Sequence, residues 1–293
     1  MSSLDMDFAC DVPLGPLTWY GVGGKAQCLA HPRDKDQLAL LVQRCAQQQV
    51  PTYILGSGAN LLVRDGGVPG VVVQLDGEAF VSCAIQAPHV VVGAGYDLMK
   101  LVRVTAGAGL SGLESLAGIP ASAGGAVRMN AGGVFGEIGP LVHQVQAMAE
   151  SGDLLTLGRE DLAFGYRCSN LAGLLILEVT FALEPGDPLA LMKKVKEVFA
   201  YKKTRQPLGA NSGGCAFKNP AAPHDPAGQL IDRAGLKGFT LGSAQVSPIH
   251  ANFITVDKAG GRADDVVEVM AHVQSVVNER FGVMLDREVV VWP

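Results

Sequence analysis

Apolar positions along the chain follow two spacings, one typical of helices and one typical of strands. Helices are predicted where apolar residues recur every three or four positions, as within 38–45 and 266–281. Strands are predicted at short apolar or alternating runs. The predicted helices are 34–48, 97–108, 188–203, 227–234 and 264–281, with a helical turn at 112–118. The predicted strands are 25–31, 51–55, 69–75, 141–150, 174–184, 250–257 and 288–292, with β-branched runs in 79–92. Residues 1–75 therefore resemble a small β-α-β unit, a strand-rich region follows, and a boundary is predicted near 184–188.

Composition narrows the class of protein. A chain of 293 residues suggests roughly two domains at about 150 residues each. Charged residues make up 17%, below the usual share of about 25%, and hydrophobic residues 48%, which excludes a disordered chain or a coiled coil. Glycine is frequent, at 37 of 293 residues, and it falls in clusters without a three-residue period. Clustered glycines predict loops in which the backbone closely approaches another group.

Charge and cysteine usage narrow the partners. The net charge is −5, so we expect no nucleic-acid partner. The acidic start MSSLDMDFACDV is unlike a signal peptide, and no apolar run is long enough for a membrane span, so we expect no membrane partner. Six cysteines without a CxxC pair indicate reduced thiols and a cytoplasmic protein. No histidine pair has metal-ligand spacing, so no metal is predicted.

The first candidate for chemistry is the segment 55–62, LGSGANLL. A strand that ends in glycines exposes successive backbone N–H groups, which can hold a pyrophosphate. A dinucleotide-binding fingerprint would need a third glycine and a following helix, but Leu61 takes the glycine's place and a turn follows. The segment is therefore either a pyrophosphate loop of another kind or a tight turn between strands.

The second candidate is the segment 118–133, GIPASAGGAVRMNAGG. Its glycines and alanines are poor formers of helix or strand, so we expect a loop that packs flat against a planar ligand or phosphates. A purely structural turn of small residues is the alternative.

Three further residues carry reactive groups. Arg167, in FGYRCS, must be paired if it is buried, with either a structural carboxylate or an anionic substrate; the spacing alone slightly favours the structural pair. Cys215, in GGCAFKNP, is either a thiol whose pKa the nearby Lys218 lowers or an inert buried cysteine. Glu288 lies beside an arginine, which alone is typical of a surface residue.

Eight motifs together resemble one enzyme family. In order they are YGVGGKA (20–26), GSGANLLV (56–63), GIPASAGGAVRMNAGG (118–133), FGYRCS (164–169), GGCAFKNP (213–220), AGQLIDRAGLKG (227–238), HANFITV (250–256) and LDREV (285–289). The chain resembles the UDP-N-acetylenolpyruvoylglucosamine reductase (MurB) family from about Leu17 to its end, in the shorter subtype that lacks an extra tyrosine-bearing loop. The resemblance implies an α+β fold. An FAD-binding region of the p-cresol methylhydroxylase type would have subdomains at 1–75 and 76–185, and a substrate-binding domain would follow at 186–293.

The resemblance also implies a reaction. In this family NADPH reduces a non-covalent FAD, the flavin N5 delivers hydride to C3 of the enolpyruvyl ether, and C2 is protonated to give UDP-N-acetylmuramate. By motif match, Arg167 and Glu288 would stabilise charge at the substrate carboxylate, and Cys215 would donate the proton. Serine is usual at the position of Cys215, but a thiol, with a reference pKa of about 8.5, is an easier proton donor than an alcohol.

The same resemblance implies two sets of binding residues. FAD would be held by Gly56, Ser57, Gly58, Ala59, Asn60, Leu61, Gly118, Ile119, Pro120, Ser122, Gly124, Gly125, Ala126 and Asn130. The UDP-sugar substrate would be held by Lys202, Lys203, Lys218 and Asn219, with Gln229, His250 and Asn252 as weaker candidates. For most lysines of 188–203 a solvated face is at least as plausible. Cations suit the diphosphate because it carries two phosphate charges.

Two alternatives stay open. Another FAD enzyme of the same superfamily, such as a sugar or hydroxy-acid oxidase, would not need GGCAFKNP followed by HANF and a C-terminal glutamate, and often carries a histidine for covalent flavin. A non-catalytic flavin or nucleotide-sugar binder would have lost the proton donor. For the reductase we expect NADPH and UDP-N-acetylglucosamine-enolpyruvate as partners and favour a monomer.

Overall fold

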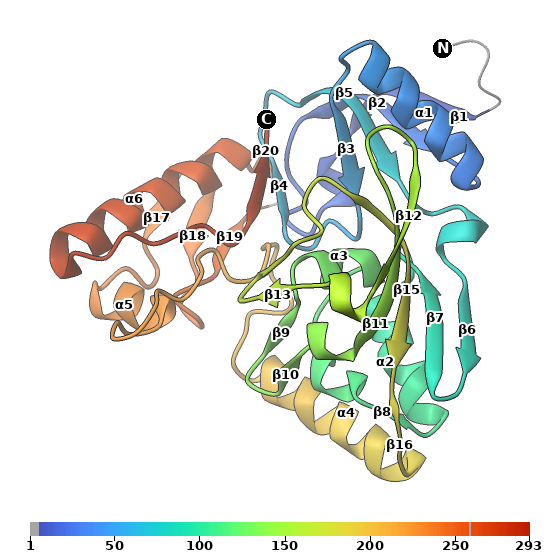
Figure 1. Ribbon diagram of the computed structural model, residues 1–293. Coiled ribbons are helices and arrows are strands. Elements are labelled where there is room, and N and C mark those ends of the chain that lie inside the picture. Colours follow the sequence, from blue (N-terminus) through green and yellow to red (C-terminus); the bar gives the residue numbers. More distant parts are fainter. Residues whose placement is uncertain (1–5, 258) are drawn as a thin grey trace. The chain divides into compact units, whose positions relative to one another are not determined.

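The computed structural model describes residues 6–257 and 259–293 and divides the chain into two compact units, coloured along the sequence in Figure 1. Unit 1 contains the described residues up to Cys10 together with Cys28–Ser57 and Gly70–Lys202. Unit 2 contains Asp11–Gln27, Gly58–Pro69 and the described residues from Lys203 to Pro293. Each unit has its own hydrophobic core, so each is described by itself.

The helices are close to those predicted. They are α1 (Lys35–Gln47), α2 (Leu98–Gly107), α3 (Ala123–Arg128), α4 (Pro188–Lys203), α5 (Ala227–Arg233) and α6 (Ala263–Phe281). Short 3-10 turns lie at Gly15–Leu17, Glu78–Phe80, Leu113–Leu116, Gly139–Leu141 and Arg159–Asp161. The segment 118–133 was expected to be a loop, and that expectation is wrong for its middle, where α3 forms.

The strands are numerous and mostly short. They are β1 (Asp7–Pro13), β2 (Lys25–His31), β3 (Thr52–Leu55), β4 (Leu61–Val63), β5 (Val68–Gln74), β6 (Cys83–Gln86), β7 (His89–Gly93), β8 (Leu110–Ser111), β9 (Gly132–Gly133), β10 (Gly136–Glu137), β11 (Val142–Met148), β12 (Leu154–Gly158), β13 (Phe164–Gly165), β14 (Cys168–Ser169), β15 (Leu175–Ala182), β16 (Glu184–Pro185), β17 (Thr240–Leu241), β18 (Ala244–Val246), β19 (Ile254–Val256) and β20 (Val290–Trp292).

Unit 1 is built around an antiparallel sheet in the order β12-β11-β15-β7-β6. Val145, Val179 and Val92 follow one another across three strands of this sheet and are fully buried, because β-branched residues pack well on a pleated surface. α3 packs against β15 and β7. A second sheet, in the order β1-β2-β5-β3, has β3 and β5 in parallel.

Two amphipathic helices complete the core of unit 1. Asp34 caps the start of α1, because its side chain accepts a hydrogen bond from Gln37 N at 2.8 Å. The helix buries the predicted apolar face. α4 buries Leu191, Val195 and Val198 in the same core. Residues 188–202 of α4 therefore belong to unit 1, and Lys203 is the first residue of the following part of unit 2.

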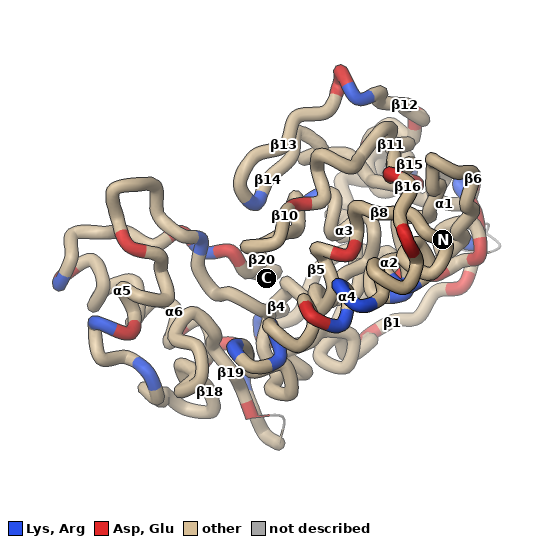
Figure 2. The backbone as a smooth tube through the Cα atoms, turned by 90° about the horizontal axis from the view of Figure 1, so that it is seen from below, with Lys and Arg blue, Asp and Glu red and all other residues tan. Residues whose placement is uncertain are grey.

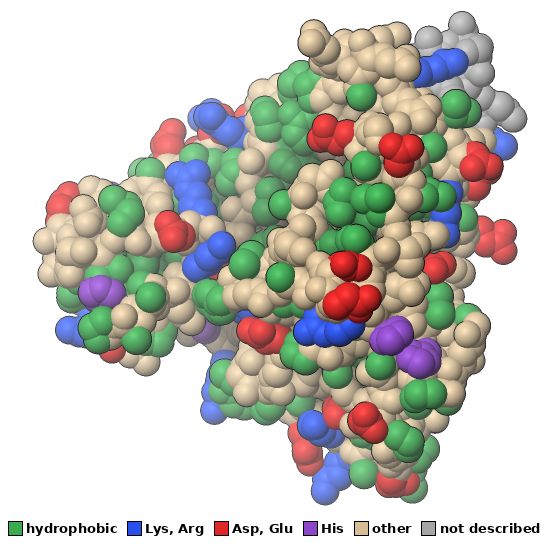
Figure 3. Space-filling model, in the orientation of Figure 1, with side chains coloured by type: hydrophobic (Ala, Val, Ile, Leu, Met, Phe, Trp, Pro, Cys, Tyr) green, Lys and Arg blue, Asp and Glu red, His purple; other side chains and the backbone are tan. Residues whose placement is uncertain are grey.

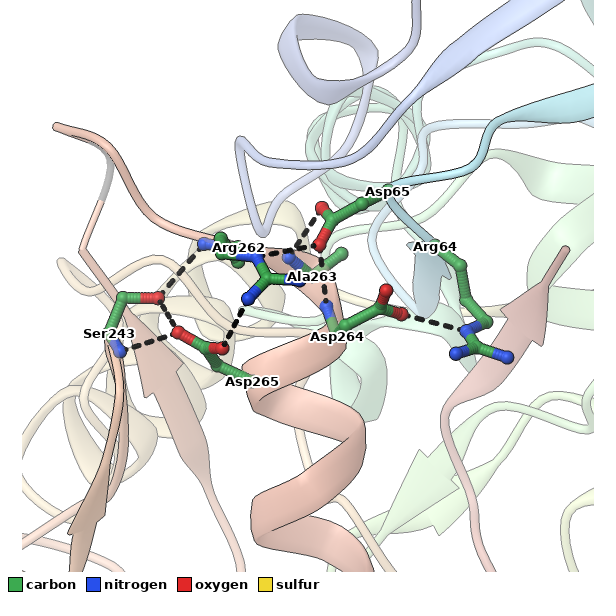
Figure 4. A network of polar contacts seen from close by, with 7 residues as sticks. All are labelled: Arg64, Asp65, Ser243, Arg262, Ala263, Asp264 and Asp265. Carbon is green, nitrogen blue, oxygen red and sulfur yellow. Dashed lines mark hydrogen bonds and ion pairs between the residues drawn. The ribbon is translucent and has the colours of Figure 1, made fainter.

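Unit 2 consists of a three-stranded antiparallel sheet, β17-β18-β19, against which α6 packs, and a parallel pair in which β20 lies beside β4. A polar network holds the start of α6 (Figure 4). The Asp65 carboxylate accepts from the backbone N–H groups of Ala263 and Asp264, which lack intrahelical acceptors. The helix ends at Gly282, whose φ of +67° favours glycine.

None of the described helices is long and apolar enough to cross a membrane. On the face drawn in Figure 3, the Lys and Arg side chains are scattered among acidic and apolar ones and form no continuous basic patch.

Candidate active site

The glycine-rich turn between β3 and β4 exposes a row of backbone donors. Among the described residues, no N–H group from Gly56 to Asn60 donates a backbone–backbone hydrogen bond. The turn is tight: a Cβ on Gly56 would lie 2.6 Å from Ser122 Oγ in unit 1, and a Cβ on Gly58 would lie 2.1 Å from Leu17 O in unit 2. Gly58 also has a φ of +64°. Consecutive unsatisfied N–H groups form a site suited to an anion.

The second glycine-rich segment is organised differently, because most of the backbone donors in 119–126 are already used. The N–H groups of Ile119, Ala123, Gly124 and Ala126 donate to Leu116 O, Tyr96 O, Ala94 O and Ser122 O, and Gly125 N donates to the buried cap Ser122 Oγ at 3.3 Å. A Cβ on Gly124 would lie 2.7 Å from Ala94 Cβ, so glycine lets α3 pack closely on the strand end. This segment can offer a ligand a smooth surface rather than a row of N–H donors.

Asn130 is buried and fully engaged with the protein. Its Nδ2 donates to Glu137 Oε2 at 2.8 Å and to Gly165 O at 2.9 Å, and its Oδ1 accepts from Gly139 N at 2.9 Å. Its φ of +43° is one that asparagine tolerates better than most residues. Asn130 therefore fixes the base of the hairpin formed by β13 and β14.

The turn of that hairpin carries Arg167. Its backbone has a φ of +54°, and a non-glycine residue holds such a conformation only where its surroundings enforce it. Its Nη2 donates to Gly132 O at 2.9 Å, and its guanidinium lies 5.1 Å from the centroid of the Tyr166 ring. The half-buried guanidinium is thus tied to the end of the second glycine-rich segment.

Lys202 approaches the other end of the same segment. Among the lysines of α4, which are blue in Figure 2, it is the one that is buried. Its Nζ donates to Ala117 O at 2.7 Å, and a Cβ on Gly118 would lie 3.1 Å from its Cδ. Burial, and then the positive charge of Arg167, lower the pKa of Lys202 to about 8. Lys203, by contrast, is exposed, so of these two adjacent lysines Lys202 is the buried one with a lowered pKa.

In unit 2, the backbone connects Cys215 and Glu288. Residues 215–217 form bridges to Phe253 on one side and to Arg287 on the other. Glu288 N donates to Ala216 O at 2.8 Å, and Lys218 N donates to Asp286 O at 2.8 Å. The half-buried Cys215 and Glu288 therefore lie on adjacent backbone segments.

Two predicted substrate residues support this arrangement. Asn252 is buried; its Oδ1 accepts from Phe217 N at 3.0 Å and its Nδ2 donates to Phe217 O at 2.8 Å, so its amide replaces a strand partner. His250 Nδ1 accepts from Asn252 N at 3.2 Å. Burial, and then the charge of Lys237, lower the pKa of His250, so the ring is neutral at neutral pH.

The other predicted substrate residues are less constrained. Asn219 Oδ1 accepts from Ala227 N at 3.1 Å and so caps α5, while Gln229 is exposed on that helix. Lys218 is half-buried. Among the described residues, no group of three or more His, Cys, Asp or Glu side chains could hold a metal ion.

Tyr20 was not assigned a role from the sequence. Its ring is fully buried, and a Cβ on Gly213 would lie 2.6 Å from its Cε2 atom and 3.2 Å from Val289 Cγ2. Burial raises the pKa of Tyr20. The ring thus packs against Gly213, two residues before Cys215, and the motif YGVGGKA was the signal that could have identified it.

Two protein families and several known reductases match the sequence of this chain. Residues 26–158 match the FAD binding domain family, and residues 206–292 match the UDP-N-acetylenolpyruvoylglucosamine reductase C-terminal domain. The chain is 41% identical over 291 residues to the UDP-N-acetylenolpyruvoylglucosamine reductase of Syntrophobacter fumaroxidans, covering 97% of this chain and 84% of the relative. It is 41% identical over 281 residues to that of Myxococcus xanthus, covering 94% and 89%.

Solved structures agree with the sequence matches. The crystal structure of the reductase from Thermus caldophilus superposes with a TM-score of 0.83 at 38% identity, covering 98% of this chain and 99% of that one. A cholesterol oxidase superposes over 62% of this chain and 38% of its own with a TM-score of 0.50 at 19% identity, which shows a shared fold alone.

These matches define an FAD-dependent oxidoreductase that joins an FAD-binding domain of the p-cresol methylhydroxylase type to a distinct C-terminal domain. The chain belongs to the UDP-N-acetylenolpyruvoylglucosamine reductase (MurB) family, whose activity is that of a UDP-N-acetylmuramate dehydrogenase.

Proposed function

We propose that this chain uses NADPH to reduce UDP-N-acetylglucosamine-enolpyruvate to UDP-N-acetylmuramate, in peptidoglycan precursor synthesis. The observation that carries the proposal is the 38% identity and TM-score of 0.83 over 98% of the chain to a solved reductase of this family. The alternative of another oxidase is disfavoured because residues 206–292 match the C-terminal domain of the reductase family.

The chain's own residues suit FAD. The N–H groups of Gly56 to Asn60 make a donor-lined turn for the pyrophosphate, with Leu61 fixing its end in β4. The residues of 118–126 would line the cofactor, and Asn130 would act through the hairpin that it holds. When bound, FAD accepts hydride from NADPH and delivers hydride from N5 to C3 of the enolpyruvyl group.

Three side chains would act on the substrate. Arg167 and Glu288 would stabilise the negative charge that develops at the substrate carboxylate as C3 is reduced. Cys215 would donate a proton to C2, which leaves its thiolate to be reprotonated from solvent. The hydrogen bond between Glu288 N and Ala216 O supports this assignment, because it fixes Glu288 beside the residue that follows Cys215.

The cations would hold the diphosphate. Lys202 is the strongest candidate, since its charge is buried and is repelled by the positive charge of Arg167. A bound anion would offset both the burial and this repulsion. Lys203, Lys218, Asn219 and Gln229 would contribute from exposed or half-buried positions. His250 and Asn252 would act chiefly by holding Ala216 and Phe217, the residues that follow Cys215.

The finer assignments also remain proposals. They are the shorter subtype, the subdomains 1–75, 76–185 and 186–293, a monomeric state and a cytoplasmic location.

The test is turnover of the purified holoprotein. With NADPH and UDP-N-acetylglucosamine-enolpyruvate, we expect a product that has gained one hydride and one proton, and acid denaturation should release the flavin. Oxidation of a sugar or hydroxy acid by oxygen would instead identify an oxidase. A bound flavin without turnover would identify a binder.

A further inference from the structure

Glu288 is held at both of its main-chain groups. Its N–H donates to Ala216 O at 2.8 Å, and its C=O accepts from Asn60 Nδ2 at 3.0 Å. The acceptor of the first bond belongs to Ala216, the residue after Cys215. The second comes from the last residue of the glycine-rich turn, and all of these residues belong to unit 2.

The link through Asn60 is reinforced by the backbone. Val290 N donates to Asn60 O at 3.1 Å, and from there β4 and β20 run in parallel, with Leu61 beside Val290. Asn60 therefore contacts the residues on both sides of Val289: its side chain bonds to Glu288, and its backbone carbonyl bonds to Val290. Of the two ends of the carboxamide, only the Nδ2 end can donate, so the side chain of Asn60 is oriented with Nδ2 towards Glu288 O.

We propose that Asn60 is a positioning residue that places the Glu288 carboxylate for the second half-reaction. This role rests on the proposed function of Glu288 and is separate from the backbone N–H of Asn60, which would serve the cofactor. Without the carboxamide donor, Glu288 O loses this hydrogen bond, so the main chain that carries the carboxylate is held less firmly between the bonds made by Glu288 N and Val290 N. A small displacement of a catalytic group can cost about 10²-fold in rate.

The experiment separates the two half-reactions in the holoenzyme. Asn60→Ala removes the donor, and Asn60→Asp keeps the shape but replaces the donor with an acceptor. In both variants we expect the flavin content and the reduction by NADPH to stay within about twofold of wild type, because the backbone donors remain. Reoxidation by the enolpyruvyl substrate should slow by about 10–100-fold.

Gln274→Ala is the matched control. Its Nε2 donates to Leu285 O at 2.7 Å, the same kind of bond on the same segment, three residues before Glu288. We expect it to lower stability about as much as Asn60→Ala and to leave both half-reactions unchanged. Hydrogen exchange of the peptide 288–292 supplies a readout besides activity: it should be faster in Asn60→Ala than in wild type.

The outcomes are distinguishable. Failure of wild-type enzyme to be reoxidised by the substrate would refute the proposed function itself. An active wild type with Asn60 variants that lose both half-reactions equally, lose flavin, or match wild type would overturn the positioning role. An equal slowing of reoxidation in Gln274→Ala would also overturn the positioning role, since it would show that the slowing follows from a general loss of stability.

Discussion

The carboxylate of Asp265 offers a quantitative test of what holds the start of α6. Its Oδ2 accepts from Ser243 N and from Ser243 Oγ, each at 2.7 Å, and the residue is buried (Figure 4). A hydrogen bond to a charged group contributes roughly 1.5–3 kcal/mol. Because the two bonds share one carboxylate and one serine, they are not additive, so we expect Asp265→Ala to lower the free energy of unfolding of unit 2 by about 3 kcal/mol. Asp265→Asn, which keeps one acceptor oxygen, should lose about half of that.

The assay is urea unfolding of the holoprotein followed by tryptophan fluorescence. Both tryptophans of the chain, Trp19 and Trp292, belong to unit 2, so this signal reports on the unit that contains Asp265. Glu268→Ala, an exposed acidic residue one turn along α6, is the control and should change stability by no more than about 0.5 kcal/mol.

The pH dependence gives a second check. Hydrogen bonds from the Ser243 backbone and side chain lower the pKa of Asp265, outweighing its burial. Its stabilising contribution is therefore complete well above the unfolded pKa of about 3.9 and is lost as pH falls through the folded pKa. The difference in the free energy of unfolding between wild type and Asp265→Ala should therefore become smaller as the pH falls below about 4. A variant as stable as Glu268→Ala at neutral pH would refute the reasoning.

Three further predictions concern the proposed chemistry. Because the pKa of Lys202 is about 8, the dissociation constant for UDP, measured by calorimetry, should rise in the wild type as the pH passes 8. It should not rise in Lys202→Arg, because arginine stays charged. The same pH dependence of the dissociation constant in both proteins would exclude Lys202 from the diphosphate site. Cys215→Ala should be reduced by NADPH yet slow in the second half-reaction by about 10²–10⁴-fold, while Cys215→Ser keeps substantial activity; near-wild-type turnover in Cys215→Ala would show that another group donates the proton. Arg167→Ala and Glu288→Ala should keep the NADPH half-reaction and cripple reoxidation in stopped-flow measurements, and the reverse pattern would reverse their assignment.

Sequence periodicity predicted the long helices well, but it did not predict α3, a short helix whose formation depends on packing. α1, α4 and α6 follow from apolar residues at helical spacing, and their bounds agree with prediction within one or two residues. α3 was missed because AGGAVR has low helix propensity. It forms because Ser122 caps it and because Gly124 allows close contact with Ala94, a partner far away in the sequence.

The site shows the same division. Motifs led us to propose roles for Arg167, Cys215 and Glu288, but they could not show which of two adjacent lysines is buried, since both belong to a lysine-rich helix. Lys202 is buried and Lys203 is exposed, a difference that the packing of α4 sets. The amides of Asn130 and Asn252 were assigned to ligands, yet each bonds to main-chain groups that only the fold brings near. A motif records that a side chain is needed but not what it contacts.

The most direct test of the account is the visible absorbance of the flavin in anaerobic wild-type holoenzyme. NADPH should bleach it, and addition of UDP-N-acetylglucosamine-enolpyruvate should restore it with formation of one equivalent of UDP-N-acetylmuramate. A flavin that stays reduced after the enolpyruvyl substrate is added, and that recovers only on exposure to oxygen, would contradict the proposed reaction.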